Sequence, residues 1–206
     1  MSPASVYKLP RYIAICGNPK SGKSLVQEIL RDRYAVQPVD DGAILREFAM
    51  KNLGATHAQV HTQEGKASLA CWPNGDLMID ARTGEHMSWR RVLGLLGNQL
   101  EDMFGKHVMP MTACARIATL TGSFSFGSVR RDQGSYYQQR GGIVIGIENP
   151  LAPPSGNEFD EFDLSIVDYW IENDALARGL PHVTALLDLQ KKVHQIVIDH
   201  TLAKAA

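Results

Sequence analysis

The sequence predicts an α/β fold, a three-layer sandwich with a mostly parallel sheet and an inserted β-hairpin. Short apolar runs that are typical of buried strands, beginning with residues 12–16, alternate with segments of helical spacing such as residues 25–30. The chain has 206 residues, which is enough for one such domain with a sizeable core. We therefore expect residues 1–206 to form a single domain, with about 54–88 as an insertion.

Composition and charge exclude several classes of protein. The 21 basic and 22 acidic residues leave a net charge of −1, so no global field would hold the chain on DNA or on an anionic membrane. No apolar run approaches the roughly 20 residues that span a bilayer, and residues 1–11 lack the apolar stretch of a secretory signal. Cys16, Cys71 and Cys114 have no metal-like spacing. We expect a protein with reduced thiols that stays in the cytoplasm.

A phosphate-binding motif lies between the first predicted strand and the first predicted helix. Residues 17–24, Gly-Asn-Pro-Lys-Ser-Gly-Lys-Ser, match G-x-x-x-x-G-K-[ST] without a mismatch. Gly17 and Gly22 allow the backbone to turn so that successive N–H groups point inward at the positive end of a helix, where anions are stabilised. The alternative, a glycine-rich turn with an exposed lysine, is disfavoured because the flanking strand and helix are both predicted.

Each residue type in this P-loop suits a magnesium nucleotide. Lys23 is expected to reach the β- and γ-phosphates of ATP, and the hydroxyl group of Ser24 is expected to bind Mg²⁺. The predicted ATP-binding residues are Gly17, Asn18, Lys20, Ser21, Gly22, Lys23, Ser24 and Leu25.

Two carboxylates follow the second predicted strand, residues 34–39. Asp40 and Asp41 come at its C-terminal end, and ligands of open α/β sheets bind beyond the carboxyl ends of the strands. We expect Asp40 to support Mg²⁺ and either residue, Asp41 in particular, to contact the phosphoryl acceptor. The alternative is an N-cap for a helix at residues 44–52. The sequence leaves both interpretations open.

The insertion contains a hairpin signal. Two apolar runs, residues 69–72 and 77–80, flank Asn74-Gly75. Asp80 superficially resembles the carboxylate of a Walker B strand, but the preceding turn argues against that role. His57 and His61 have helical spacing, yet Ala58 stands where a zinc protease has glutamate, so a solvated helix face is favoured over a metal site.

Two further pairs of arginines lie at positions where a bound anion would be stabilised. Arg90 and Arg91 lie in the first turn of an amphipathic helix at residues 88–104, where the helix dipole disfavours positive charge. Arg130 and Arg131 follow a strand at residues 123–129, where guanidinium groups can clamp phosphates. In both places, solvent-exposed arginines are the alternative.

The remaining elements are expected at residues 108–118 (helix), 132–140 (helix), 142–147 (strand), 150–162 (loop), 165–171 (strand) and 181–204 (helix). The order strand, helix, strand over residues 123–147 predicts a parallel crossover.

With these segments in place, the chain resembles the phage-type deoxynucleoside monophosphate kinases, a branch of the P-loop kinases. The resemblance covers most of the chain and is strongest at residues 17–24. Residues 90–105 resemble a family helix that ends in Phe-Gly. Val129-Arg130 and Gly141-Gly142 resemble the family's strand that ends in arginine and its later strand that begins with Gly-Gly. Residues 171–174, Ile-Glu-Asn-Asp, resemble a late motif that lies near the adenine in related kinases, which implies that Asn173 binds the nucleotide.

The chain departs from that family on the presumed acceptor side. Asn98 and Gln99 stand where threonine and glutamate are usual, Asp102 stands in place of a common arginine, and Ser128 replaces an aspartate. The donor machinery is therefore better supported than the identity of the acceptor.

The resemblance and the motif together predict transfer of the γ-phosphoryl group of ATP to a deoxynucleoside 5′-monophosphate. The expected catalytic residues are Lys23, Arg130, Arg131, Asp40 and Asp41, and the expected substrate-binding residues are Asp41, Arg90, Arg91, Asn98 and Arg130. The expected partner is then a nucleotide substrate, and the expected location is the cytoplasm, or the host cytoplasm if the protein is phage-encoded. The sequence leaves open whether the protein forms a homodimer.

Two alternatives remain. One keeps the donor side and places the acceptor hydroxyl on a modified base, such as 5-hydroxymethyluracil in phage DNA, although the near-zero net charge counts against a DNA partner. The other is an NTP-binding switch or ATPase without an acceptor, which is disfavoured because no clear Walker B strand is present.

Overall fold

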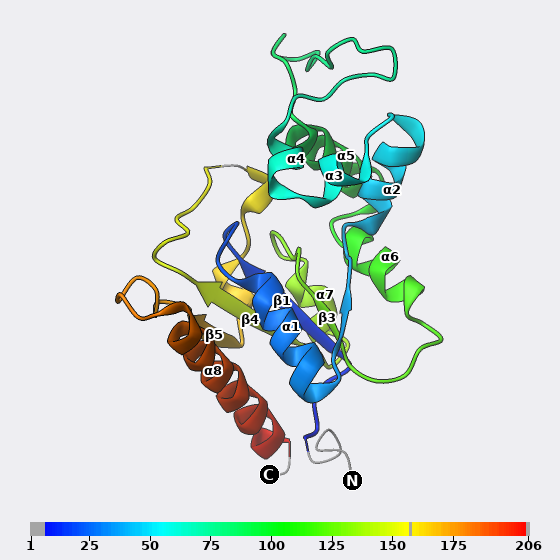
Figure 1. The fold of residues 1–206 in the computed structure, drawn as a ribbon. Helices are drawn as coiled ribbons and strands as arrows, with labels where there is room; N and C mark the ends of the chain where they lie inside the picture. The colour runs from blue at the N-terminus through cyan, green and yellow to red at the C-terminus, as the bar shows by residue number, and fades with distance from the viewer. Residues whose placement is uncertain (1–6, 157, 205–206) are drawn as a thin grey trace. The chain divides into compact units, whose positions relative to one another are not determined.

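The computed structural model describes residues 7–156 and 158–204, and one of its two compact units is built on a five-stranded parallel sheet (Figure 1). The strands are β1 (Tyr12–Gly17), β2 (Gln37–Val39), β3 (Phe124–Phe126), β4 (Ile143–Glu148) and β5 (Tyr169–Glu172). They lie in the order β2-β3-β1-β4-β5, and each neighbouring pair is parallel. Because β3 and β4 flank β1 on its two sides, the loop that begins at Gly17 leaves the middle of the sheet.

Helices cover both faces of this sheet. On one face, α1 (Lys23–Tyr34) and α8 (His182–Ala203) pack together over an apolar core that includes Ile143 and Ile145 of β4. The short helix α7 (Gly134–Gln138) also packs on β1 and β4. It contacts the side chain of Val144, because a Cβ atom added at Gly134 would come within 2.9 Å of it. Since successive side chains of a strand point to opposite faces, α7 covers the other face. The predicted α/β fold with three layers is confirmed.

The chain divides into two compact units. The sheet unit comprises residues up to Asp41 and from Arg116 onward, and the second unit is Gly42–Ala115. The helices of the second unit are α2 (Ala43–Asn52), α3 (His57–His61), α4 (Gln63–Ala67), α5 (Trp89–Phe104) and most of α6 (Val108–Arg116). A core of its own contains Val60, Met78 and Trp89. That residues 1–206 act as a single domain stays a prediction.

The predicted hairpin of the second unit contains a third segment. Asn74-Gly75 does form the turn, with Gly75 N–H donating to the Trp72 carbonyl at 2.9 Å. Residues 85–88 then join the two predicted segments. Three hydrogen bonds close a ring: Met78 N–H to Ala70 O (2.8 Å), Ala70 N–H to Met87 O (2.8 Å) and Met87 N–H to Met78 O (2.9 Å). Each segment therefore pairs with both others, and the hairpin is one part of a closed three-segment ribbon.

Several boundaries differ from the sequence prediction because short polar side chains bind the backbone. The strand expected at residues 165–171 begins only at Tyr169, since Asp163 accepts the N–H of Ser165 at 2.8 Å and starts a 3-10 turn. The helices α3 and α4 were not predicted. Thr56 and Thr62 cap them by accepting backbone N–H groups three residues ahead.

The alternative role of an aspartate, as the N-cap of α2, is wrong. The helix begins at Ala43 with Gly42 as its N-cap, and no side chain caps it. The carboxylate of Asp41 instead accepts the backbone N–H of Ser128 at 3.0 Å. It joins the segment after β2 to the segment after β3.

The longest helix, α8, has 22 residues and follows Pro181 as predicted. Its inward face buries Leu189, Val193 and His200. Neither α8 nor any other helix of the described chain is long and apolar enough to cross a membrane.

The imidazole of His200 predicts a pH dependence of stability. It is 5% exposed, and its Nε2 atom has no hydrogen-bond partner within the described chain. Burial lowers the pKa of His200, and the positive charge of Lys204 acts in the same direction. Between this lowered pKa and the ordinary value of about 6.5, the unfolded chain binds more protons than the folded chain. His200 therefore lowers the free energy of unfolding as the pH falls below about 6.5.

Urea unfolding at pH 7.5 and 5.5 checks this prediction with His200→Gln, which retains a hydrogen-bonding group without a titrating ring. The loss of stability between the two pH values should be smaller in the variant than in the wild type. An equal loss in both proteins would contradict the assignment to His200.

Candidate functional site

The predicted phosphate-binding loop has the backbone conformation that an anion cradle requires. It connects β1 to α1, and three of its residues have positive φ: Gly17 (143°), Lys20 (67°) and Gly22 (113°). A Cβ atom at Gly17 would come within 2.6 Å of the carbonyl oxygen of Ile147, which explains glycine there. The sign of φ changes at each step from Lys20 through Ser21 to Gly22, and a backbone of this kind can turn N–H groups toward one side and bind an anion.

The ammonium group of Lys23 lies across this loop. Its Nζ atom donates to the carbonyl oxygens of Gly17 at 2.6 Å and Asn18 at 2.8 Å. Ser24 is exposed in the first turn of α1, and Leu25 follows with its side chain partly packed in the core. The first N–H groups of a helix have no acceptor within the helix. The loop therefore combines a cation, a hydroxyl group and backbone donors in one short segment.

Asparagines from the loops after β4 and β5 hold the phosphate loop in place. Asn173 donates from Nδ2 to the carbonyl oxygen of Ser21 at 2.8 Å, and Asn149 approaches the same oxygen at 3.5 Å. Asn18, within the loop, donates to the carbonyl oxygen of Ala152 at 3.0 Å. That Asn173 binds the nucleotide stays a prediction, and the structure places its amide against the carbonyl oxygen of Ser21. The roles of Asn149 and Ala152 were missed, although Asn149-Pro150 directly after a buried strand was a readable turn signal.

Two groups inside the loop region face away from solvent. The Oγ atom of Ser21 is buried and has no hydrogen-bond partner within the described chain. The Cys16 thiol is buried beneath the loop, and burial raises its pKa to about 12, against the opposing charge of Lys23. Cys16 therefore remains a neutral thiol and serves as a small core residue.

The two aspartates after β2 differ in exposure. Asp40 is exposed, whereas Asp41 is 6% exposed and accepts the Ser128 N–H. Among residues 7–156 and 158–204, no three His, Cys, Asp or Glu side chains gather into a group that would hold a metal. Mg²⁺ usually takes one or two carboxylates with phosphate oxygens and water, so Ser24 with Asp40 fits the donor chemistry without such a group.

Arg130 and Arg131 follow β3 in a constrained backbone. Arg131 has a φ of 48°, which is rare for a residue with a Cβ atom. Its N–H donates to Glu161 O at 2.7 Å, and its carbonyl accepts from Asp163 N–H at 2.8 Å. The segment between β4 and β5 is thus tied by its backbone to the predicted arginine pair. No pattern in the sequence predicts this pairing.

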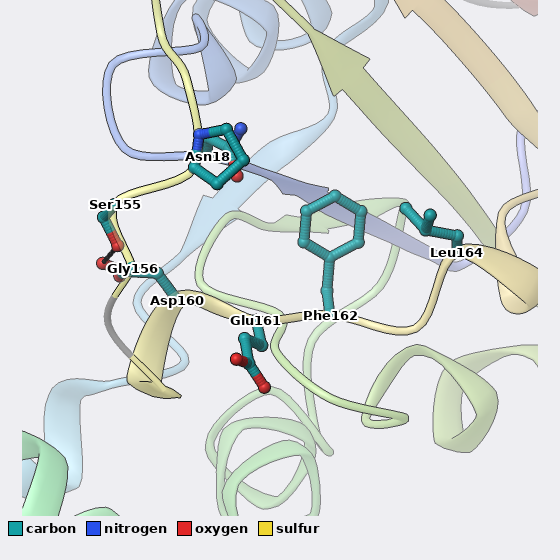
Figure 2. Close-up of a pocket in the computed structure, with 8 residues that line it drawn as sticks. Asn18, Ser155, Gly156, Asp160, Glu161, Phe162 and Leu164 are labelled. Atoms are coloured by element: carbon teal, nitrogen blue, oxygen red, sulfur yellow. Dashed lines mark hydrogen bonds between the residues drawn. The ribbon is translucent and has the colours of Figure 1, made fainter.

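Two cavities border the phosphate loop, and Asn18 and Pro154 line both. One, of about 310 Å³, lies between Asn18 and the segment that carries Phe162 and Leu164 (Figure 2). The other, of about 520 Å³, lies between residues 148–154 and the end of β5. A nucleotide with its phosphates on the loop therefore has room for its base in the larger cavity.

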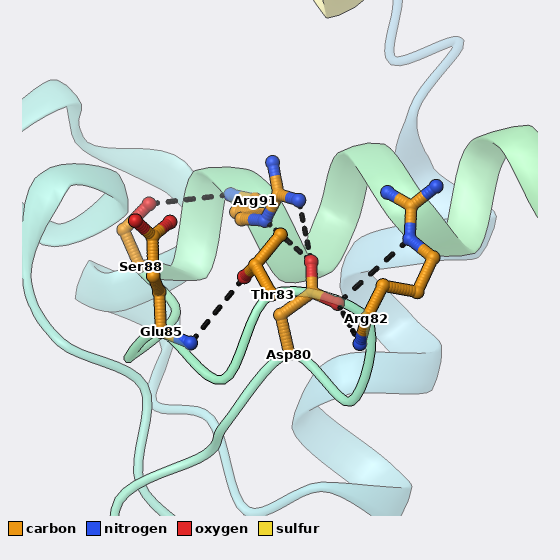
Figure 3. Close-up of polar contacts among 6 residues, drawn as sticks. All are labelled: Asp80, Arg82, Thr83, Glu85, Ser88 and Arg91. Carbon is orange, nitrogen blue, oxygen red and sulfur yellow. Dashed lines mark hydrogen bonds and ion pairs between the residues drawn. The ribbon is translucent and has the colours of Figure 1, made fainter.

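The predicted acceptor residues Arg90, Arg91 and Asn98 belong to the second unit, on α5. Arg91 donates from Nε to Asp80 at 2.9 Å and forms a second contact through Nη2 (Figure 3). Asp80 also accepts the N–H of Arg82 at 2.9 Å, and these hydrogen bonds lower the pKa of Asp80. Asp80 thus explains a positive charge in the first turn of α5.

Two other sequence interpretations concern residues of the second unit. Asp80 lies in the closed ribbon and not at the end of a strand of the parallel sheet, so the rejection of a Walker B role is confirmed. His57 and His61 stack with ring centroids 4.0 Å apart. They belong to α3, whose turn places residues four apart on one face.

No protein-family model and no curated protein matches this chain. Among solved structures, it is similar to dephospho-CoA kinase from Campylobacter jejuni, with 12% identity and a TM-score of 0.48 over 92% of this chain and 98% of that one. It is also similar to a shikimate kinase from Acinetobacter baumannii in complex with shikimate, with 16% identity and a TM-score of 0.44 over 97% and 99%. TT1252 from Thermus thermophilus has 15% identity and a TM-score of 0.45 over 94% and 98%. Similarities this low support no conclusion about function. The functional proposal rests on the geometry of the loop at residues 17–24 instead.

Gly17→Ala tests the cradle. The variant should lose about 1–3 kcal/mol of stability from its positive φ, and more from the collision with the Ile147 carbonyl. Its affinity for a fluorescent ATP analogue should fall at least about tenfold, because the loop cannot keep its conformation.

Gly75→Ala is the matched control. Gly75 also has positive φ (91°), but nothing lies within 4 Å of an added Cβ atom. Urea unfolding and analogue titration of both variants should show strain in each and loss of binding only in Gly17→Ala. Unchanged binding by Gly17→Ala would exclude this loop as the phosphate site.

Proposed function

We propose that this protein is a phosphotransferase that moves the γ-phosphoryl group of ATP to a deoxynucleoside 5′-monophosphate. The observation that carries the proposal is the geometry of residues 17–24. A loop with three residues of positive φ stands at the start of a helix, and Lys23 bridges its carbonyl oxygens. Such a loop supplies converging N–H donors and one cation, which is what a polyphosphate tail needs.

Lys23 has a specific role in this proposal. Its two contacts are to backbone carbonyl oxygens, and a phosphate oxygen carries more negative charge than either. The ammonium group can therefore exchange a carbonyl contact for the β- and γ-phosphates without leaving the loop. Ser24 and Asp40 would hold Mg²⁺, which neutralises charge on the phosphates when it is bound.

Arg130 and Arg131 would stabilise the transferring group. They follow β3, which is adjacent to β1 in the sheet, so they leave the sheet at the same edge as the phosphate loop. Guanidinium groups bind phosphate oxygens through paired N–H donors. Phosphoryl transfer depends mainly on positioning and charge neutralisation, so no covalent nucleophile is required of the protein.

The acceptor side is the second part of the proposal. Arg90, Arg91 and Asn98 would bind the monophosphate, with Asp41 near its reacting oxygen. Arg91 binds Asp80, and Arg90 donates from Nη2 to Gln63 Oε1 at 2.5 Å, so both guanidinium groups would exchange a protein contact for the phosphate.

A kinase of a hydroxymethylated base in DNA is the second candidate function. The closed ribbon favours it, because Trp72 is 47% exposed and Ile79 is 54% exposed. Exposed aromatic side chains can stack on unpaired bases.

Lys23→Ala should reduce the rate of phosphoryl transfer about 10²- to 10³-fold, since one positioned donor at a transferring group contributes that much. Lys191→Ala on the exposed side of α8 is the control and should transfer normally. Circular dichroism establishes that both variants fold. Near-normal transfer by folded Lys23→Ala would remove the assignment of the loop.

An acceptor screen with γ-labelled ATP separates the candidate functions. Label in a deoxynucleoside diphosphate supports the first proposal. Label only in a hydroxymethylated duplex supports the second candidate and rejects the first. Release of inorganic phosphate at one rate with every acceptor would instead identify an ATPase.

A further inference from the structure

A lysine of α8 holds the segment after β5 on both sides of the residue that contacts the phosphate loop. Lys192 donates from Nζ to the carbonyl oxygen of Glu172 at 2.5 Å and to Asp174 Oδ1 at 2.9 Å. These two acceptors flank Asn173 in the sequence. The amide of Asn173 donates to the carbonyl oxygen of Ser21 at 2.8 Å. One ammonium group therefore brackets the side chain that holds the loop.

Asn173 fits closely against the loop. A Cβ atom added at Gly22 would lie 2.6 Å from Asn173 Nδ2, so the amide lies directly on the backbone of Gly22. The backbone N–H of Asn173 donates to the carbonyl oxygen of Glu148 at 2.7 Å, which joins the residue to the end of β4. At such short distances, a displacement of residues 172–174 would move the amide away from the loop.

Lys192 is itself held by a network of opposite charges. Its Nζ atom lies 2.9 Å from Asp188 Oδ2, one helical turn earlier on α8. Arg178 closes the network, with Nε 2.9 Å from Asp174 and Nη2 3.6 Å from Asp188. Burial lowers the pKa of Lys192, but its hydrogen bonds with Asp188 and Asp174 raise it, and the net shift is upward. Lys192 therefore stays charged at neutral pH.

This charge network, Asp174, Arg178, Asp188 and Lys192, is expected to contribute little to overall stability. Its four side chains are between 26% and 52% exposed. Ion pairs with that exposure are screened by solvent, and ordering their long side chains costs entropy. The effect of the network is therefore expected to be local, at residues 172–174.

We propose that Lys192 is a positioning residue for the phosphate loop: it keeps the amide of Asn173 on the carbonyl oxygen of Ser21 and so preserves the loop conformation that binds ATP. The inference rests on the proposed function where it concerns ATP, whereas the effect on the loop without nucleotide does not. Lys192 acts through Asn173 and requires no contact with the nucleotide.

A double-mutant cycle tests this inference by titration of a fluorescent ATP analogue with magnesium present. Lys192→Met retains an unbranched apolar side chain and removes the ammonium group. It should weaken binding about 2- to 30-fold, the range for a residue that influences a site without contacting the ligand. In the Asn173→Ala background, Lys192→Met should cause no further loss, because the residue through which it acts is already absent. Lys191→Met, on the exposed side of α8, is the control and should bind as the wild type does.

A second readout uses ¹⁵N-labelled protein without nucleotide. Lys192→Met should shift the backbone amides of Ser21 and Gly22, although the backbone and carboxylate groups that Lys192 binds belong to residues 172, 174 and 188. Lys191→Met should leave both amides unchanged. Urea unfolding of Lys192→Met should be close to that of the wild type.

The outcomes separate this inference from the proposed function. Equal losses of affinity from Lys192→Met in both backgrounds would show that Lys192 acts without Asn173 and would overturn the inference. Unchanged affinity, unchanged loop amides or a large loss of stability in Lys192→Met would also overturn it. Absence of binding by the wild type would instead overturn the proposed function, and the amide shifts would still test the positioning of the loop.

Discussion

The backbone carbonyl of Ser21 is the contact on which the rest of the site depends. It accepts the amide of Asn173 at 2.8 Å and faces Asn149 at 3.5 Å, so the loops after β5 and β4 both hold the phosphate loop. A loop with three residues of positive φ, two of them glycine, has many accessible backbone conformations and needs outside contacts to hold one of them. The asparagines fix one conformation, and the N–H groups are therefore oriented before any ligand arrives. Preorganisation of this kind is what lets backbone dipoles stabilise charge effectively.

The order of the strands makes this contact achievable. β1 lies in the middle of the sheet, with β3 on one side and β4 on the other. Residues that follow the neighbouring strands must then emerge beside the Gly17 loop. Asn149 follows β4, and Arg130 follows β3. The same rule brings Glu148 and Glu172 together at the end of β4 and β5. A parallel sheet thus gathers residues far apart in sequence at a single edge.

Local patterns in the sequence predicted local structure well. The loop at residues 17–24 is recognisable because every required residue lies within eight positions. The long helices are predicted correctly, since apolar periodicity and capping residues mark them, and Ser88 caps α5 as expected. Short elements were less visible. The helices α3 and α4 have five residues each, too few for a periodicity to appear.

Long-range contacts could not be predicted in the same way. The backbone pairing of Arg131 with residues 161–163 depends on the positive φ of Arg131, which no sequence pattern predicts. The ribbon needed a third segment, residues 85–88, that has no turn signal linking it to the first. An N-cap is one of the two roles that the sequence leaves open for Asp41, because it precedes a helix, yet its carboxylate binds Ser128, 87 residues later. Asn173 was identified only through the resemblance of its motif.

Amide chemical shifts test most directly whether the backbone amides of the loop bind the phosphates. In ¹⁵N-labelled protein, addition of magnesium and a non-hydrolysable ATP analogue should shift the amides of Ser21, Gly22, Lys23 and Ser24 more than those of the second unit. Saturable binding of the analogue without shifts at these four amides would contradict the account, because the ligand would then lie elsewhere.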